Sequence, residues 1–171
     1  MENQQGNNIV LVGLMGAGKS TVGKELASIL GFSFIDTDDE LERRMGVSIP
    51  VIFDVEGEEG FRIRESKVIA DMPSQKNSVI STGGGSVLNA ENRHCLKQCG
   101  KVVYLSASVE TLFERTKNSK KRPLLHNSDI KATIESLLTD RQGLYLDVAD
   151  IVIESGKFSP KDMAKRIVGK L

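Results

Sequence analysis

Short runs of β-branched and aliphatic residues alternate along the chain with longer segments whose apolar residues follow a helical pattern. The short runs predict five β-strands, at residues 9–12, 32–35, 79–81, 102–105 and 151–153. The longer segments predict helices at residues 19–30, 39–45, 58–70, 90–99, 108–117, 130–148 and 159–168. Because the predicted strands are apolar on both faces, we expect helices to cover each side of the sheet. The alternation therefore predicts one three-layer α/β/α domain over residues 1–171, with a five-stranded parallel sheet.

Two helix starts carry sequence signals. Ser159 and Pro160 precede Asp162, which gives a capping hydroxyl, a proline at the first helical position and an acid in the first turn. Ser48, followed by isoleucine and proline, indicates another start, although Val51 stands where a capping box has Glu or Gln. The segment 118–128 has the most loop-like composition inside the chain.

Charge balance and cysteine content limit the classes of function. With 23 basic and 23 acidic residues the net charge is zero, so the chain has no general attraction to nucleic acid or anionic lipid. No apolar stretch approaches the ~20 residues of a membrane span, and the N-terminus lacks a signal-peptide pattern. Cys95 and Cys99 lie beside His94 without a second ligand pair, so we interpret them as reduced thiols rather than zinc ligands. The sequence predicts a cytoplasmic protein without nucleic-acid or membrane partners.

A glycine-rich motif follows the first predicted strand. The run Gly13-Leu14-Met15-Gly16-Ala17-Gly18-Lys19-Ser20 matches G-x-x-x-x-G-K-[ST] at every fixed position, between a strand and a helix. Its glycines let successive backbone N–H groups face one phosphate, and the helix N-terminus adds its positive dipole end. Lys19 can reach the β and γ phosphates, and the Ser20 hydroxyl can bind Mg²⁺. The motif predicts nucleoside triphosphate binding, which GTPases, motors and small-molecule kinases share.

Acidic residues close the second predicted strand. Asp36 and Asp38 stand at its carboxyl end, where open α/β sheets bind their ligands. We expect both to face the same cleft as the glycine-rich motif, one near Mg²⁺ and the other near an acceptor hydroxyl. Asp39, Glu40 and Glu42 continue the acidic run, and we interpret those three as a solvated face.

Two arginines are candidates for binding an anionic substrate. Arg62 lies one helical turn from Glu65, which allows a surface ion pair, but it could instead bind a carboxylate in the cleft. Arg141, on the predicted helix at 130–148, is a second candidate of this kind. The spacing alone leaves these interpretations open.

A basic segment and a glycine run complete the candidate site. The segment from Arg115 to Arg122 contains no acid, and we interpret it as a lid whose Arg122 closes on the phosphates. A nucleic-acid site is a weaker interpretation, since no aromatic residue interleaves the charges. The run Gly83-Gly84-Gly85 follows the third predicted strand, where backbone N–H groups can approach a ligand. No acid stands at that strand end, so Asp36 is the expected metal ligand.

Together these residues resemble the shikimate kinase family, a group of P-loop kinases related to nucleoside monophosphate kinases. The resemblance spans about residues 9–160 and rests on the P-loop, Phe34-Ile35-Asp36-Thr37-Asp38, Gly57-Glu58-Glu59-Gly60-Phe61-Arg62, Gly83-Gly84-Gly85, Arg122-Pro123-Leu124-Leu125, Arg141 and Leu144-Tyr145. It implies that ATP and shikimate give ADP and 3-phosphoshikimate in aromatic amino-acid biosynthesis. It also implies a monomeric P-loop kinase fold, with a small helical substrate-binding subdomain at about residues 38–70 and a lid at about 115–128.

The resemblance also implies a role for each matching residue. ATP would be bound by Gly16, Ala17, Gly18, Lys19, Ser20, Thr21, Arg115 and Arg122. Shikimate would be bound by Asp38, Arg62, Gly83, Gly84, Gly85 and Arg141. Lys19, Asp38 and Arg122 would be catalytic, and Mg²⁺ would lie at Ser20 and Asp36. The resemblance leaves open whether Lys157 or Phe158 contacts adenine.

Four other functions remain as alternatives, and one of them, a kinase-like fold kept only for binding, is disfavoured by the intact set of predicted catalytic residues. A gluconate-type kinase needs similar groups, but Arg62, the glycine run and Arg122 together favour shikimate. A nucleoside monophosphate kinase would need more aromatic residues on its acceptor side. A GTPase-like switch would use the formal D-x-x-G run at residues 54–57, but the chain has no N-K-x-D motif.

Overall fold

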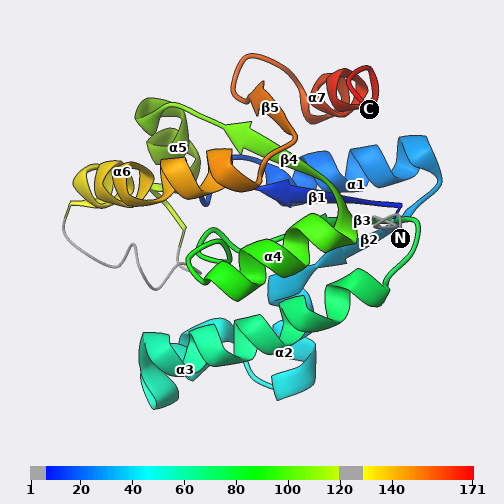
Figure 1. Cartoon of the computed structure of the whole chain (residues 1–171). Helices are drawn as coiled ribbons and strands as arrows, with labels where there is room; N and C mark the ends of the chain where they lie inside the picture. The colour runs from blue at the N-terminus through cyan, green and yellow to red at the C-terminus, as the bar shows by residue number, and fades with distance from the viewer. Residues whose placement is uncertain (1–6, 120–128) are drawn as a thin grey trace.

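The computed structural model describes residues 7–119 and 129–171 (Figure 1). One parallel sheet contains five strands in the order β2-β3-β1-β4-β5. The strands are β1 (Asn8–Val12), β2 (Ser33–Asp36), β3 (Ser78–Ser81), β4 (Gly100–Ser106) and β5 (Ile151–Glu154). The helices are α1 (Lys19–Leu30), α2 (Thr37–Met45), α3 (Ile49–Asp71), the 3₁₀ helix η1 (Met72–Ser74), α4 (Ala90–Cys99), α5 (Val109–Thr116), α6 (Ile130–Val148) and α7 (Pro160–Val168). The predicted α/β class and five-stranded parallel sheet are confirmed.

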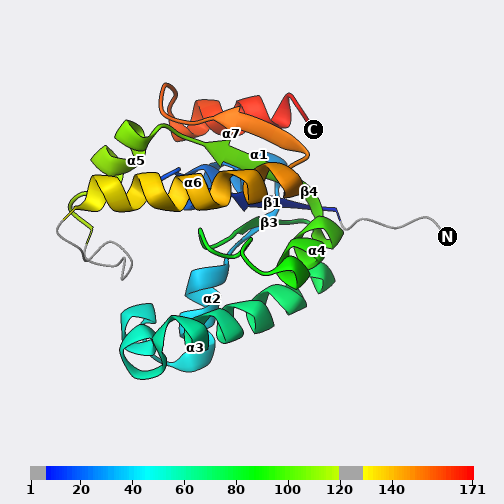
Figure 2. The same ribbon diagram turned by 60° about the vertical axis from the view of Figure 1, so that its left-hand side comes forward.

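Helices cover both faces of the sheet, as Figures 1 and 2 show. On one face α1 packs against α7 and against β2 and β3. On the other face α4 and α6 contact β4, and α3 packs beyond α4 together with α2. This arrangement follows from right-handed crossovers, because the chain runs in one direction across the sheet from β1 to β2 and then returns.

The inner strands carry the core. Every residue of β1 and β3 is buried, and β4 is nearly so. The edge strands β2 and β5 are partly exposed, so the expectation of two covered faces is wrong for them. An edge strand has a neighbour on one side only, and its covering helices overlap it less completely.

The long helix α3 begins at Ile49, which confirms the helix start indicated at Ser48, and it runs on into the helix predicted from residue 58. It contains a break at Gly57, where φ is 71° and ψ is −176°, a left-handed region that favours glycine. The Ser48 side chain makes no capping hydrogen bond; instead the Glu42 Oε1 atom accepts from the Ile49 N–H at 3.3 Å. At α7 the predicted cap is confirmed, since Ser159 Oγ accepts from the Asp162 N–H.

Helix α1 approaches the sheet closely at Gly23. A Cβ placed there would lie 2.6 Å from a ring carbon of Phe34 and 3.2 Å from Leu11 Cδ1. Gly143 in α6 offers the opposite case, because a Cβ there would meet nothing within 4 Å.

We expect Gly23→Ala to lower the free energy of unfolding by about 1–3 kcal/mol, because the added methyl overpacks the contact between α1 and β2. Gly143→Ala should raise it by up to about 1 kcal/mol, since alanine reduces the entropy of the unfolded chain. Urea denaturation of both variants checks the pair. Destabilisation of equal size would contradict the packing argument.

Candidate active site

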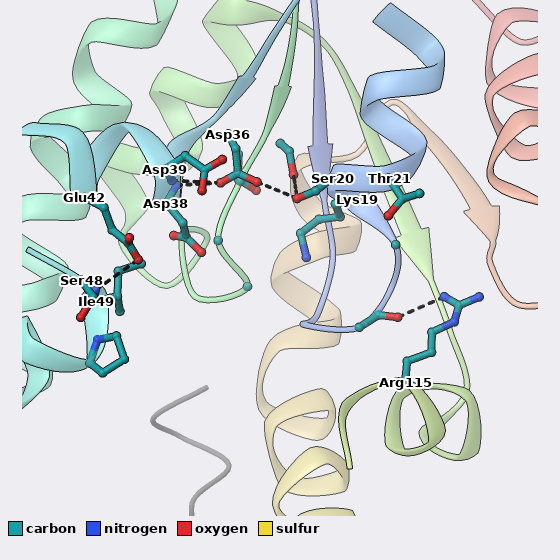
Figure 3. A pocket seen from close by; sticks show the side chains of 17 residues that line it. Lys19, Ser20, Thr21, Asp36, Asp38, Asp39, Glu42, Ser48, Ile49 and Arg115 are labelled. Carbon is teal, nitrogen blue, oxygen red and sulfur yellow. Dashed lines mark hydrogen bonds between the residues drawn. The ribbon is translucent and has the colours of Figure 1, made fainter. Parts of the chain in front are cut away.

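Three neighbouring strand ends position the main cleft. Because β3 lies between β1 and β2, Ser81 pairs in register with Leu11 on one side and Asp36 on the other. The loops after these strands open on the same edge of the sheet, around a cleft of about 750 Å³ (Figure 3). The cleft is lined by Gly16, Gly18, Lys19, Ser20, Thr21, Asp36, Asp38, Asp39, Glu42, Ser48, Ile49, Pro50, Ser81, Thr82, Gly83, Gly84 and Arg115.

The glycine-rich loop between β1 and α1 folds around the Lys19 side chain. Lys19 is only 8% exposed, and its Nζ donates to the carbonyl oxygens of Gly13 at 2.7 Å and Leu14 at 3.0 Å. Gly13 has φ 148°, and a Cβ there would lie 2.6 Å from the Leu105 carbonyl oxygen. The loop conformation therefore depends on glycine and holds a cation against its own backbone.

A hydroxyl and a carboxylate meet beside the loop. Ser20 Oγ donates to Asp36 Oδ2 at 2.6 Å and lies 3.4 Å from Ser81 Oγ (Figure 3). These oxygen atoms are hard donors of the kind that Mg²⁺ prefers. Within residues 7–119 and 129–171 there is no group of three or more His, Cys, Asp or Glu that could hold a metal ion alone. The donor set fits Mg²⁺ held jointly with nucleotide phosphates, since that ion keeps few protein ligands.

The start of α2 places a further carboxylate, that of Asp38, in the cleft. Asp36 Oδ1 caps the helix by accepting from the N–H of Asp38 at 2.9 Å and of Asp39 at 3.3 Å. Asp38 faces the glycine run, because its Oδ1 would lie 3.0 Å from a Cβ on Gly83. The structure thus brings Asp36 and Asp38 to the same cleft as the glycine-rich loop.

The remaining residues of the acidic run, Asp39, Glu40 and Glu42, differ in their surroundings. Glu40 pairs with Arg43 and Arg44 on the surface, and these two guanidinium groups lower the pKa of its carboxyl to about 2. Asp39 and Glu42 line the cleft, and Glu42 is half-buried. The expectation of a plain solvated face is therefore wrong for Glu42, because its carboxylate supplies the acceptor that α3 lacks at its first turn.

A buried charge cluster lies next to the glycine run. Arg62 Nη1 donates to Glu65 Oε1 at 2.9 Å, and Glu65 is 2% exposed, so this pair is not a surface ion pair. The Arg62 guanidinium lies so close to Gly85 that a Cβ at Gly85 would collide with it. Arg141 is 3% exposed, and its Nη1 would lie 3.6 Å from a Cβ on Gly84. Both arginines therefore converge on the glycine run.

Several atoms of this cluster are left without hydrogen bonds. Among the described residues, no partner is found for Arg62 Nε, Glu65 Oε2 and Arg141 Nη1, and all three atoms are buried. Burial raises the pKa of the Glu65 carboxyl, and the charges of Arg62 and Arg141 oppose that rise. Buried, unsatisfied donors of this kind favour an acidic ligand.

The glycine run is held by neighbours on both sides. Gly83 N–H donates to Thr37 Oγ1 at 3.3 Å, and the buried Tyr145 hydroxyl donates to the Gly84 carbonyl oxygen. The Tyr145 ring stacks on Tyr104, with centroids 5.0 Å apart. These contacts turn the run toward Asp38 and the arginines.

Arg115 and Thr21, two of the residues predicted to bind ATP, lie at the glycine-rich loop. Arg115 Nη1 donates to the Gly16 carbonyl oxygen at 3.0 Å (Figure 3), and Thr21 is exposed at the cleft. Phe158 packs under Arg166, whose Cζ lies 3.5 Å from the ring centroid. Arg122 lies outside the described residues, as does most of the expected lid.

The weaker sequence alternatives find little structural support. On α4, His94 contacts Gln98, and Cys99 donates to the Cys95 carbonyl oxygen. Residues 54–57 belong to α3 and do not line the main cleft. In the part of the chain that the structure describes, no helix is long and apolar enough to cross a membrane.

Sequence reasoning missed two residues of the site. Glu65 was considered only as an ion-pair partner of Arg62, and nothing in its spacing showed that it would be buried beside Arg141. Tyr145 belongs to a motif of the resemblance, but its hydrogen bond to Gly84 joins residues 61 positions apart, which the motif does not predict. The apolar character of α6 around Tyr145 was the only available signal.

A phosphate-binding loop, neighbouring acids and buried arginines around one cleft define a P-loop kinase of a small acidic molecule. A family model for shikimate kinase matches residues 15–171. This chain belongs to the shikimate kinase family, and it is an ATP-dependent kinase that phosphorylates a shikimate hydroxyl.

Individual relatives cover nearly the whole chain. The shikimate kinase of Histophilus somni is 51% identical over 162 residues, covering 94% of this chain and 93% of that protein. That of Nitrosospira multiformis is 48% identical, covering 96% of this chain and 84% of that protein. The structure of a shikimate kinase from Acinetobacter baumannii in complex with shikimate superimposes with a TM-score of 0.94 at 46% identity, over 98% of this chain and 93% of that one.

The raised pKa of Glu65 gives the stability a pH dependence. Above the ordinary glutamate value of 4.5, the unfolded chain has released a proton that the native state still binds. The free energy of unfolding should therefore fall as the pH rises from about 4.5 through the native pKa. Glu65→Gln removes this contribution, so its stability should fall less steeply over the same range. Urea denaturation between pH 4 and 7 measures both slopes, and equal slopes would show that the assignment is wrong.

Proposed function

We propose that the single cleft binds ATP at the loop of residues 16–21 and shikimate between α2, α3 and the glycine run. The supporting observation is that the loop, both acids and Gly83–Gly84 line one continuous cavity. Arg141 adjoins this cavity at Gly84, whereas Arg62 and Gly85 line a neighbouring pocket. The γ-phosphoryl group then leaves the β–γ bridging oxygen of ATP and joins the 3-hydroxyl oxygen of shikimate.

On the ATP side, the backbone N–H groups of residues 16–21 would bind the phosphates, helped by the N-terminus of α1. Lys19 would place its charge on the β and γ phosphates, where negative charge develops during transfer. Arg115 would lie along the nucleotide from the other side of the loop. Arg122 would stabilise the transferring group, a role predicted from the sequence alone.

Ser20 and Asp36 would hold Mg²⁺, Ser20 through its hydroxyl and Asp36 through its carboxylate. The bound ion would neutralise phosphate charge and orient the γ-phosphoryl group. The short Ser20–Asp36 contact supports this assignment, because it shows both oxygens on the same side of the loop.

On the acceptor side, Arg62 and Arg141 would bind the shikimate carboxylate, and the N–H groups of Gly83 to Gly85 would line the same pocket. Supporting this, Arg141 has a buried, unsatisfied Nη1 atom among the described residues. Glu65 and the more exposed Glu58 both pair with Arg62, so the buried Arg141 is the main positive charge that a carboxylate would neutralise.

Asp38 would accept hydrogen bonds from the shikimate hydroxyls and take the proton that the attacking oxygen loses. Phosphoryl transfer through a loose transition state needs little deprotonation before attack, so positioning is a large part of this role. The position of Asp38 opposite Gly83 supports the assignment.

The proposed domain organisation follows the same division into an ATP side and an acceptor side. We propose residues 38–70, which α2 and α3 largely form, as the substrate-binding subdomain, and about 115–128 as the lid. A monomeric state and a cytoplasmic location stay predictions from the sequence.

We predict that Asp38→Asn lowers kcat by a factor of 100 or more while the KM for ATP changes little, because the amide cannot accept the proton. Steady-state assays of ADP release measure both constants. Asp54→Asn, in α3 and outside the cleft, is the matched control and should leave both unchanged. A small drop in kcat for Asp38→Asn would remove the proton-accepting role.

Arg141→Gln should raise the KM for shikimate at least tenfold and leave the KM for ATP nearly unchanged, since the arginine acts on the acceptor carboxylate. Arg43→Gln, which breaks a surface pair on α2, is the control. If both KM values rose together in Arg141→Gln, the carboxylate assignment would not stand.

A further inference from the structure

One buried hydroxyl joins the end of β5 to the phosphate-binding loop. Ser155 is 5% exposed, and its Oγ donates to the Ala17 carbonyl oxygen at 2.8 Å. The same oxygen accepts a hydrogen bond from Arg115 Nη1 at 3.0 Å. The Ser155 hydroxyl therefore donates its single hydrogen to the loop and accepts a hydrogen bond from Arg115, which also contacts the loop.

The sheet, rather than the loop, fixes the position of Ser155. Its N–H donates to the Ser106 carbonyl oxygen at 2.7 Å, which extends the pairing of β4 and β5 by one residue. The following residue packs closely as well, because a Cβ on Gly156 would lie 3.2 Å from Thr111 Oγ1. Ser155 is therefore a rigid anchor for the parts of the loop that it touches.

This anchor determines where the loop N–H groups point. In a planar trans peptide the C=O and N–H bonds point in opposite directions, so holding the Ala17 carbonyl turns the Gly18 N–H away from Ser155. Arg115 fixes the preceding peptide group, between Gly16 and Ala17, in the same way, since its Nη1 also donates to the Gly16 carbonyl oxygen at 3.0 Å. The N–H of that peptide group, on Ala17, donates back to the Leu14 carbonyl oxygen at 3.1 Å.

We propose that Ser155 is a positioning residue for the ATP phosphates, acting through the Gly18 N–H and through Arg115. The inference rests on the proposed function in one respect, that ATP binds at the loop of residues 16–21. Donors that are already oriented lose little entropy when a ligand binds, so the Ser155 hydroxyl strengthens nucleotide binding. The residue has no contact with the acceptor side, so shikimate binding does not depend on it.

Ser155→Ala tests the proposal, because it removes the hydroxyl and leaves the backbone pairing intact. We expect the KM for ATP and the Kd for ADP to rise about tenfold. The KM for shikimate and kcat should stay within twofold of the unaltered protein. Ser155→Thr keeps the hydroxyl and should restore tight nucleotide binding. The control is Ser106→Ala on the adjacent strand, whose hydroxyl lies 3.5 Å from the Ile153 carbonyl oxygen and does not touch the loop.

An unchanged KM for ATP in Ser155→Ala, or a parallel rise in both KM values, would overturn the inference. If Ser155→Ala does not fold, Ser155→Cys is measured instead. Its thiol is a weak donor, and the same split between the two KM values is expected at smaller size. Calorimetric ADP binding to Lys19→Ala separates the two hypotheses. Retained affinity there would place the phosphates elsewhere and refute the proposed function. Lost affinity, combined with normal binding to Ser155→Ala, would refute only the role of Ser155.

Discussion

The chemistry of this protein depends on one geometric constraint, that parallel strands end at the same edge of a sheet. Because β3 lies between β1 and β2, the loop after β1, the acids after β2 and the glycine run after β3 are adjacent. The contact of Ser20 with Asp36 and Ser81 is a direct result, since it joins α1 to both strand ends. A strand order that placed β2 beyond β4 or β5 would separate the phosphate-binding loop from the acids.

In the proposed function, the two sides of the cleft would bind anions by different physical means. On the nucleotide side, oriented backbone dipoles and one buried amine supply the positive potential, and few side chains are needed. On the proposed acceptor side, Glu65 and Arg141 are buried and Arg62 is partly exposed, and burying an ion costs several kcal/mol unless its charge is paired. Glu65 offsets part of that cost, and Glu58 pairs with Arg62 from its exposed side at 3.3 Å. Arg141, whose buried Nη1 atom has no partner among the described residues, is the charge that a carboxylate ligand would pair with.

Local sequence patterns were sufficient for the parts of the fold that local interactions determine. The helix at residues 130–148 and the cap at Ser159 match the structure, because periodicity and capping act within a few residues. The start of α3 at Ser48 was indicated, but the sequence did not show that this start and the helix from residue 58 form one element across Gly57. In the site, the motif spacing correctly predicted that Asp36 and Asp38 lie at the carboxyl end of the second strand and face the cleft. It could not reveal the burial of Glu65 or the role of Ser155, whose bond to Ala17 spans 138 residues.

The break in α3 shows which forces orient the acceptor side. Across Gly57, Arg64 makes two hydrogen bonds to Glu56, at 2.8 and 2.6 Å, but both side chains are about one-third exposed. Exposed pairs of this kind contribute about 0–1 kcal/mol, too little to fix the angle between the two helical segments. Apolar packing across the break is larger, because the Phe53 and Phe61 ring centroids are 4.8 Å apart and Phe61 is buried. A buried aromatic side chain is worth about 1.5–3 kcal/mol, so this contact holds the first turns of α3 at the cleft. The hydrophobic core, rather than surface charge, therefore sets the distance between the mouth of the cleft and Arg62, the partly exposed residue that follows Phe61.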